Sequence, residues 1–553
     1  MNPMGRLGGS GGKASRRGLG TRGLGTRSCK HNTQTRKQTR AHTLLAAAVA
    51  ATLAALPALS QTLPPPPVSP APVLNLEYDP QGNVKRLIQA PGAGNYSTSH
   101  TYDGLHRRTV TTDARSKTTQ LSYNGRDDLV QLTDPRSLVT QYPRNGLGDA
   151  TGLVSPDTGT ATHTFDAAGN LTTRLDSRGV LATYSHDALD RLRSITYTQA
   201  NQTPQVFTWA YDQTGPGFSN GIGRLTSTQF PAGSATYAYD QQGRMVGTTQ
   251  AVRSGVTVWL STAYGYDAAG RITSITYPSG RVLSIPHVGG QAASMSLAPA
   301  AGSPGLPLIS DLQFEPGPGA PGAVRSWNWQ LNTGTLAHNR VFDAYGRMLR
   351  YPLGGAVRDL TYDAADRIVS YTHWDASSAA PVLALNQGFG YDELGRLTSV
   401  STGTDSWAMG YDDNGNRSAV SYTSAGGTTV RNYTTSTSSN RLLSLDNASR
   451  TMTHDAAGNR VGDSQGQTAH SAVFDLAGRL ARLNGTFNGY TFTDYEHNAF
   501  GQRVLKLDLG ARHNDFRTSR PAAAHGAATA PACTAARDDQ PQAPPVPHPG
   551  PHA

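Results

Sequence analysis

The chain has 553 residues, of which 37% are hydrophobic, and its aromatic residues are mostly tyrosine, with 23 Tyr against 12 Phe and 6 Trp. This composition excludes a thick buried core and favours thin layers of structure with water on much of their surface. The net charge of +10 does not indicate a nucleic-acid-binding face. Ten of the 48 lysines and arginines lie between residues 6 and 40, and the other 38 balance 38 acidic residues.

The N-terminal segment has the pattern of an export signal. An apolar run, Thr43–Leu56, follows the basic segment, and small residues follow at Ala58–Ser60. The run is too short to span a bilayer comfortably, and the order basic, apolar, small is typical of a Sec-type signal peptide. We therefore predict a basic lead plus signal peptide at residues 1–60 and an extended Pro-rich linker at 61–73.

This signal predicts an exported bacterial protein, periplasmic, cell-surface or secreted, with no membrane span after cleavage. The two cysteines, Cys29 and Cys533, both lie outside the segment between the linker and the C-terminal tail. That segment therefore contains neither disulfides nor a thiolate zinc site.

A short motif, aromatic–Asp–x–x–Gly–Arg, recurs through residues 74–507 at intervals of mostly about 20 to 29 residues, as expected of a repeat architecture. Asp followed three residues later by Gly matches a type I turn, in which the carboxylate accepts turn amides and Gly adopts positive φ. Second turns follow half a repeat later, as at Asp134, Asp176 and Pro278. Runs between the turns, such as Arg271–Tyr277, alternate apolar and polar residues with the period of a β-strand.

Each repeat is therefore predicted to be a β-hairpin unit, and the fold class is all-β, one long antiparallel sheet built from these units. We expect the motif aromatics to stack from one repeat to the next. Asn at the Arg position, as at Asn170, Asn416 and Asn459, indicates that polarity matters more there than charge. The predicted structural motif residues are Tyr78, Asp79, Gly82, Tyr239, Asp240, Gly243, Arg244, Tyr266, Asp267, Gly270, Arg271, Phe342, Asp343, Gly346, Arg347, Tyr391, Asp392, Gly395, Arg396, Tyr411, Asp412, Gly415, Phe474, Asp475, Gly478 and Arg479.

Two segments interrupt the repeat pattern. Residues 284–323 are rich in Gly, Pro and Ala, which predicts either an irregular insertion or degenerate repeats. Residues 508–553 contain neither alternating runs nor a copy of the motif, which predicts a disordered tail.

Tyr266, Asp267 and Arg271 could form an acid/base site, but the same three residue types recur along the chain, whereas a catalytic centre needs one constellation in one pocket. No H-E-x-x-H, G-x-S-x-G or Walker pattern occurs in the repeat region. We therefore predict a non-enzymatic protein with no catalytic, cofactor-binding or metal-binding residue. Two alternatives stay open, a glycan hydrolase that uses distant aspartates and sugar stacking on Trp327, Trp329 or Trp407.

The stretches Tyr266–Ser284, Tyr391–Val400, Phe474–Leu480 and His497–Lys506 resemble the YD-repeat, or Rhs (rearrangement hotspot), proteins. Related repeats occur in bacterial polymorphic toxins, in toxin-complex shells and in teneurins. The resemblance implies a sheet strip that spirals into a hollow shell, which in the toxins encloses a C-terminal effector behind a core segment that cuts itself with aspartates.

No such core motif or effector is recognisable after the repeats, so no catalytic residue can be carried over, and we predict a truncation or frameshift near Gly510. The resulting expectation is an exported container or surface scaffold of a toxin or cell-contact system. Its expected partner is an encapsulated effector or a cell-surface glycan, with no nucleic acid. The alternative is a cell-envelope adhesin that binds carbohydrate or a partner.

Overall fold

The computed structural model describes residues 62–92, 96–317, 321–466, 468–486 and 490–510. All of them belong to the first of the two units into which the chain divides, Met1–Asp515. The predicted signal peptide and the part of the predicted tail after residue 510 lie outside the described residues.

The described residues form an all-β structure, and their only helical element is the short 3-10 turn η1 (Leu383–Leu385). The burial of a typical strand alternates from residue to residue, as in Thr118–Tyr123, because successive side chains point to opposite faces. At each motif turn the strand register shifts by one residue, as between Gly265 and Tyr266. This shift is a β-bulge, an extra residue on one strand of the pair.

The first sheet has 23 strands. They are β1 (Leu74–Tyr78), β2 (Val84–Gln89), β3 (Tyr96–Tyr102), β4 (Arg108–Thr112), β5 (Thr118–Tyr123), β6 (Leu129–Thr133), β7 (Val139–Gln141), β8 (Gly152–Ser155), β9 (Gly159–Phe165), β10 (Leu171–Leu175), β11 (Leu181–His186), β12 (Leu192–Thr198), β13 (Gln205–Tyr211), β14 (Leu225–Phe230), β15 (Gly233–Tyr239), β16 (Met245–Ser254), β17 (Val256–Tyr266), β18 (Ile272–Thr276), β19 (Val282–Ser284), β22 (Met295–Ala298), β23 (Leu306–Phe314), β24 (Val324–Leu331) and β25 (Gly334–Asn339).

The second sheet has 16 strands. They are β26 (Val341–Phe342), β27 (Met348–Leu353), β28 (Ala356–Tyr362), β29 (Ile368–Asp375), β30 (Gln387–Tyr391), β31 (Leu397–Ser401), β32 (Ser406–Tyr411), β33 (Arg417–Ser424), β34 (Gly427–Thr435), β35 (Leu442–Leu445), β36 (Arg450–His454), β37 (Arg460–Gln465), β38 (Thr468–Phe474), β39 (Leu480–Thr486), β40 (Tyr490–His497) and β41 (Arg503–Gly510). The last strand ends three residues beyond the predicted end of the repeats.

Within each of the two sheets, each strand pairs antiparallel with the next one along the chain, with one detour in the first sheet. Strand β19 pairs with β22, because β20 (His287–Val288) and β21 (Gln291–Ala292) form a separate hairpin between them. Residues 284–323 thus contain two strands, β22 and β23, that continue the main ladder, and one hairpin, β20–β21, that lies outside it.

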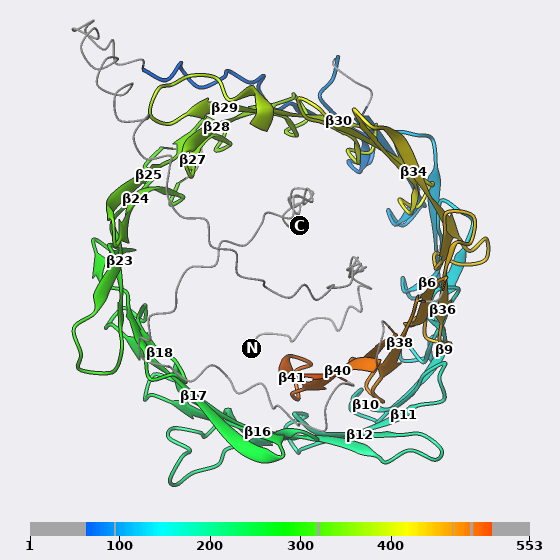
Figure 1. The fold of residues 1–553 in the computed structure, drawn as a ribbon. Coiled ribbons are helices and arrows are strands. Elements are labelled where there is room, and N and C mark those ends of the chain that lie inside the picture. The colour runs from blue at the N-terminus through cyan, green and yellow to red at the C-terminus, as the bar shows by residue number, and fades with distance from the viewer. Residues whose placement is uncertain (1–61, 93–95, 318–320, 467, 487–489, 511–553) are drawn as a thin grey trace, which may run out of the picture. The chain divides into compact units, whose positions relative to one another are not determined.

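The strip of strands has two edges. We call the edge that carries the aromatic–Asp turns the YD edge, and the opposite edge, with turns such as those at Asp134 and Asp176, the return edge. We call residues 74–339 the first pass and residues 341–510 the second pass. The second pass lies alongside the first, as Figure 1 shows for β34–β38 beside β6–β10. The hydrogen bonds that join them link residues between 271 and 306 positions apart, which confirms the predicted spiralling antiparallel strip.

The predicted linker takes part in this arrangement. It is extended, and the main-chain N–H of Val73 donates to the carbonyl of Ala364 at 3.2 Å. The Ser69 hydroxyl accepts the main-chain N–H of Tyr362 at 2.9 Å. Residues 69–73 therefore lie against the start of the second pass.

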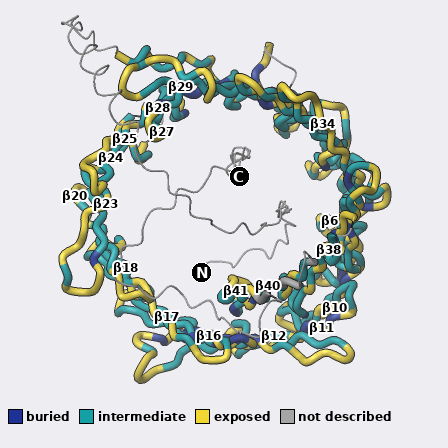
Figure 2. Tube along the Cα trace, in the orientation of Figure 1, coloured by how far each residue is buried: buried dark blue, intermediate teal, exposed yellow. Residues whose placement is uncertain are grey.

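Buried residues occur in short separate stretches along the strip (Figure 2), which agrees with the composition. A compact apolar cluster forms around Phe207, Trp209, Phe230 and Ala232. Side chains of the second pass, among them Ala499 and Val504, pack against it. Apolar burial thus reinforces the contact between the passes at this point.

Candidate functional site

The YD turn at Asp267 engages both carboxylate oxygens of the residue that an acid/base site would need as its acid or base. The Oδ1 atom of Asp267 accepts the main-chain N–H groups of Ala269 at 2.9 Å and Arg271 at 3.0 Å. The Oδ2 atom accepts the Nε–H of Arg271 at 2.7 Å. The main-chain N–H of Arg271 is the largest cause that lowers the pKa of Asp267. The carboxylate is thus held ionised as the acceptor of its own turn.

The third residue after Asp267 is Gly270, which has a φ of 83° and donates its N–H to the Asp267 carbonyl at 3.0 Å. Copies of the motif without glycine adopt the same left-handed conformation, with φ of 63° at His106 and 65° at Asp366. The geometry of the turn therefore persists where the sequence departs from the consensus.

The motif tyrosines contact arginine, so the predicted stacking of aromatics from repeat to repeat is wrong. The guanidinium of Arg244 lies 4.7 Å from the ring centre of Tyr266, one repeat later. The phenol of Tyr266 donates to the carbonyl of Met245 at 2.7 Å. Arg244 thus covers the face of the ring, where a cation is favourable, and the main chain of Met245 holds the phenol.

The same arrangement recurs at other repeats. Arginine lies over the ring at Arg191–Tyr211, Arg347–Tyr362, Arg367–Tyr391 and Arg396–Tyr411. Tyr78, in the first strand, is 56% exposed.

The motif arginine also reaches the next turn, which the sequence interpretation missed. The Nη1 of Arg244 donates to the carbonyl of Asp267, the first residue of the next YD turn, at 2.9 Å. We call this bond the arginine clasp. It recurs between Arg367 and Asp392, Arg396 and Asp412, and Arg479 and Asn498, at 3.2, 2.8 and 3.0 Å. Each clasp fixes one repeat to the next.

Two repeats of the second pass carry asparagine in place of this arginine. Asn416 and Asn459 keep the turn bond, since their Nδ2 atoms donate to Oδ2 of Asp412 and Asp455, each at 2.8 Å. This supports the prediction that polarity is what the position requires. The asparagine side chain is shorter than that of arginine, however, and the clasp to the following turn comes from elsewhere.

The first pass supplies both missing clasps. Arg136, in a return turn, donates through Nη2 to the carbonyl of Ser436 at 2.6 Å, in the turn that follows Asn416. Arg178, also in a return turn, donates through Nη1 to the carbonyl of Asp475 at 3.0 Å, in the turn that follows Asn459. Both arginines thus occupy the position that a motif arginine takes within a pass.

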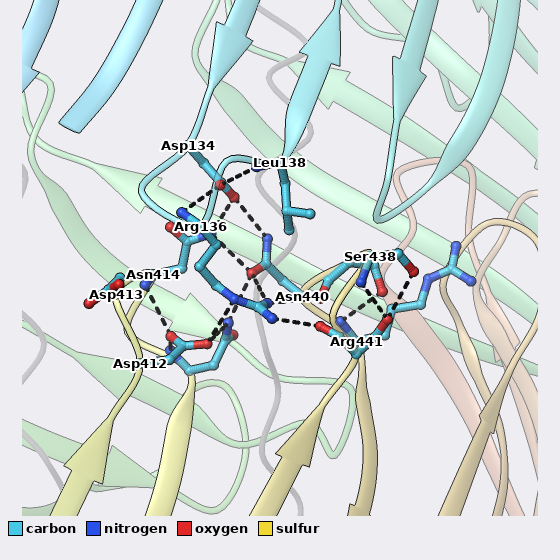
Figure 3. Close-up of polar contacts among 12 residues, drawn as sticks. Asp134, Arg136, Leu138, Asp412, Asp413, Asn414, Ser438, Asn440 and Arg441 are labelled. Carbon is cyan, nitrogen blue, oxygen red and sulfur yellow. Dashed lines mark hydrogen bonds and ion pairs between the residues drawn. The ribbon is translucent and has the colours of Figure 1, made fainter. Parts of the chain in front are cut away.

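Figure 3 shows how Arg136 enters the second pass, between the turns at Asp412 and Asn440. Its Nη1 donates to the carbonyl of Ser439 and to Oδ1 of Asn440, each at 2.9 Å. Its Nε lies 3.4 Å from Oδ2 of Asp412. The Nδ2 of Asn414 in turn donates to Oδ2 of Asp134. The return turn at Asp134 is therefore bound on both of its sides.

Further contacts join the two passes on both sides of Arg136. We call the whole line of contacts between the first and the second pass the seam. The Nε of Arg441 donates to the carbonyl of Asp157 at 2.9 Å, and the main-chain N–H of Asn440 donates to Oδ1 of Asp157 at 2.6 Å. Lys117 forms an ion pair with Asp413 at 3.0 Å. Everywhere along the seam, the return edge of the first pass meets the YD edge of the second.

The tryptophans considered for sugar stacking lie in contacts within the sheet. Trp327 stacks on His338 with ring centres 3.9 Å apart, and Trp329 meets Trp327 edge-on. The ring of Trp407 lies 5.1 Å from that of Tyr422. A different residue, Trp259, has a side chain that is 66% exposed.

Within the described residues, no three His, Cys, Asp or Glu side chains are grouped so that they could hold a metal ion. That part of the chain also has no helix of the length and apolar character needed to cross a membrane.

Comparisons with known proteins agree with this geometry. A model of the RHS repeat matches residues 165–202, 220–257 and 253–282. A comparison with curated protein sequences finds no match. The fold is similar to the crystal structure of TcdB2-TccC3, with a TM-score of 0.60, 14% identity and coverage of 79% of this chain.

The fold is also similar to a Photorhabdus luminescens Tc holotoxin pore that carries a mutated TccC3, with a TM-score of 0.57, 14% identity and coverage of 80% of this chain. The matched part spans 28% and 27% of those two chains, so this chain corresponds to under a third of their length.

Proposed function

Because this chain is an Rhs, or YD-repeat, protein related to toxin-complex shells, we propose that it forms part of the wall of an exported, toxin-associated β-shell without enzymatic activity of its own. In this role the strip would surround an effector and keep it from the surroundings. Support for this role comes from the repeats, from the likeness in fold to the TcdB2-TccC3 structure and from the signal-peptide pattern of residues 1–60.

The observation that carries the proposal is the seam. A strip of hairpins stacked in a single row leaves the turns along both of its edges exposed to solvent. Here the return edge of the first pass is bound to the YD edge of the second by arginine clasps from Arg136 and Arg178. Two passes joined side by side make a continuous surface, which is what a wall requires.

A fused reporter enzyme tests the container role. We propose to attach a small ribonuclease after Ala553 and to measure cleavage of a large structured RNA that cannot enter through small openings. The intact chain should suppress cleavage at least tenfold relative to the free ribonuclease. The double variant Arg136→Gln/Arg178→Gln should restore cleavage, whereas Arg193→Gln, an exposed arginine on β12, should not. Full activity in the unaltered fusion would contradict a container.

A second candidate, a carbohydrate-binding adhesin, is favoured by one observation. The hairpin of β16 and β17 is long, and it presents Trp259 and Val256 with side chains that are 66% and 71% exposed. An exposed indole face is a surface on which a sugar ring can stack. A glycan array with the wild-type chain and the Trp259→Ala variant distinguishes the roles, since binding that depends on Trp259 would support adhesion.

A further inference from the structure

A fully buried histidine lies where few main-chain bonds join two neighbouring strands of the second pass. His373, on β29, is 1% exposed. β29 pairs with β30 through two residue pairs, Ser370–Gly388 and Tyr371–Gln387, whereas β28 and β29 share seven. Residues 376–386 connect β29 to β30 (Figure 1). Strands joined by so few bonds are among the first parts of a fold to open.

The connection between β29 and β30 is anchored on His373. The main-chain carbonyl of His373 accepts the N–H of Val382 at 2.9 Å. Its main-chain N–H donates to Oδ1 of Asn386 at 2.8 Å, and Nδ1 of its ring lies 3.4 Å from the same oxygen. Val382 and Asn386 flank the short turn η1. The position of His373 therefore determines whether the second half of the connection stays on the wall.

The ring of His373 is held in its neutral form. Its Nε2 accepts the Nε–H of Arg358, on β28, at 2.8 Å. A guanidinium nitrogen can only donate, so Nε2 carries a lone pair and the ring proton is on Nδ1, toward Asn386. Burial and the nearby charge of Arg358 lower the pKa of His373.

Two carboxylates lie on the same strands, and both are already engaged. Asp359 of β28 favours a charged His373, but its own oxygens accept the Nε–H and Nη2–H of Arg350 at 2.5 and 2.6 Å. Asp375 of β29 accepts the Ser377 hydroxyl at 2.6 Å through Oδ1. Neither carboxylate bonds to the imidazole. The described residues thus bind no acid to His373 that could compensate the charge of Arg358.

Arg358 is fixed from two further sides. Its Nη1 donates to the hydroxyl of Tyr351, on β27, at 2.8 Å. Its guanidinium lies 4.4 Å from the ring centre of Tyr371, on β29. A proton on Nε2 of His373 would set two N–H donors and two positive charges against each other across 2.8 Å. Because Arg358 is held by both tyrosines, the imidazole is the group that moves.

We propose that β29 and β30 form an acid-operated opening in the wall. Protonation of His373 drives its ring away from Arg358 and breaks the contacts of His373 with Val382 and Asn386. Residues 376–386 then leave the wall, and β30 separates from β29, since two residue pairs alone remain between them. This response belongs to the wall itself, whether or not the wall surrounds an effector.

Hydrogen exchange of the full-length protein, followed by mass spectrometry at pH 7.5 and 5.0, tests the opening. A histidine released from Arg358 has an ordinary pKa of about 6.5, so at pH 5.0 about thirty protonated rings exist for each neutral one. The ratio of open to closed connections should therefore rise up to about 30-fold. After correction for the intrinsic effect of pH, peptides covering residues 376–391 should lose about tenfold or more of their protection, while peptides of β32 and β33 should keep theirs.

Two matched pairs of variants identify the groups. His373→Gln keeps an acceptor for Arg358 but takes up no proton, so it should lose the acid response, whereas His470→Gln, on β38, should keep it. Arg358→Gln removes the opposing charge and should weaken the response, whereas Arg358→Lys retains the charge and should preserve it. A carbodiimide cross-link between Lys117 and Asp413, which lie 3.0 Å apart, checks that each variant keeps its seam.

Three results would overturn the proposal. The first is equal protection of residues 376–391 at both pH values in the wild-type protein. The second is a wild-type acid response in a His373→Gln variant that still forms the cross-link. If His373→Gln does not form the cross-link, the two Arg358 variants decide, and an equal acid response in Arg358→Gln and Arg358→Lys is the third.

Discussion

The cross-pass clasp of Arg178 allows a sharp test of what holds the two passes together. Its guanidinium donates to the carbonyls of Asp475 and Leu476 at 3.0 and 2.9 Å, and it also binds Oδ2 of Asp176 at 2.8 Å. Replacement by glutamine removes the charge and shortens the side chain, so both carbonyls of the second pass lose their donor.

The expected loss in free energy follows from these bonds. A hydrogen bond from a charged group contributes about 1.5–3 kcal/mol, and two such bonds end on the second pass. The Arg178 side chain is 13% exposed, so water can replace part of the interaction. We therefore expect Arg178→Gln to lower the free energy of unfolding by about 3 kcal/mol in urea titrations, whereas Arg193→Gln should change it by less than about 0.5 kcal/mol.

A second measurement separates the seam from stability in general. Arg244 makes a clasp within the first pass, to the carbonyl of Asp267, so Arg244→Gln should also destabilise the protein. The carbodiimide cross-link between Lys117 and Asp413 reports the distance between the passes. We expect Arg178→Gln and Arg136→Gln to lower its yield and Arg244→Gln to leave it unchanged. The reasoning is refuted if Arg136→Gln/Arg178→Gln keeps both wild-type stability and wild-type cross-link yield.

Three further predictions concern the turns and the polar interior. Gly270→Ala should destabilise the fold by about 1 kcal/mol, because Gly270 has a φ of 83°. The control Gly104→Ala, where an added Cβ meets open space, should be nearly neutral. Equal effects of the two substitutions in thermal unfolding would contradict the role of positive φ. Asp359→Asn should lower the free energy of unfolding by about 3–5 kcal/mol, since Asp359 is 2% exposed and pairs with Arg350. Asp494→Asn, which loses the exposed pair with Arg482, should lower it by at most about 1 kcal/mol. Similar losses of stability in urea titrations would show that burial does not set the contribution of these ion pairs. Burial raises the pKa of Tyr362 to about 12, so at pH 10 to 12 the folded state keeps a proton that the unfolded chain has released. The free energy of unfolding should therefore fall as the pH rises from 10 to 12. If Tyr362→Phe leaves this fall unchanged, the prediction is wrong.

The local structure of the repeats could be predicted because it depends on residues close in sequence. The spacing from Asp267 to Gly270 determines a type I turn whatever lies elsewhere, and the alternation in Arg271–Tyr277 determines a strand. The clasp could not be predicted in the same way. It depends on which residue faces the carbonyl of Asp267 from the neighbouring repeat, 23 positions away for Arg244, and on the ring of Tyr266 that keeps this arginine in place.

The seam was harder still to predict, because its offset depends on the curvature that many hairpins accumulate. A small error in twist at each strand changes which turn meets Arg136 several hundred residues later. The sequence nevertheless contains a usable signal. Asn416 and Asn459 lie two motif turns apart, and Arg136 and Arg178 lie two return turns apart. Matching the spacing of asparagine steps to that of arginine-bearing return turns would have aligned the two passes.

This correspondence assigns a function to the substitution of arginine by asparagine. Both residues complete their own turn through a bond to the motif Asp, as Arg271 and Asn459 do. The turn itself therefore forms with either residue. They differ in reach. Arginine reaches the main-chain carbonyl of the next turn from within its pass, as Arg396 does at Asp412, whereas after Asn459 the carbonyl of Asp475 accepts an arginine from the first pass. In the second pass, the identity of this one residue therefore decides whether the next turn is clasped from within the pass or across the seam.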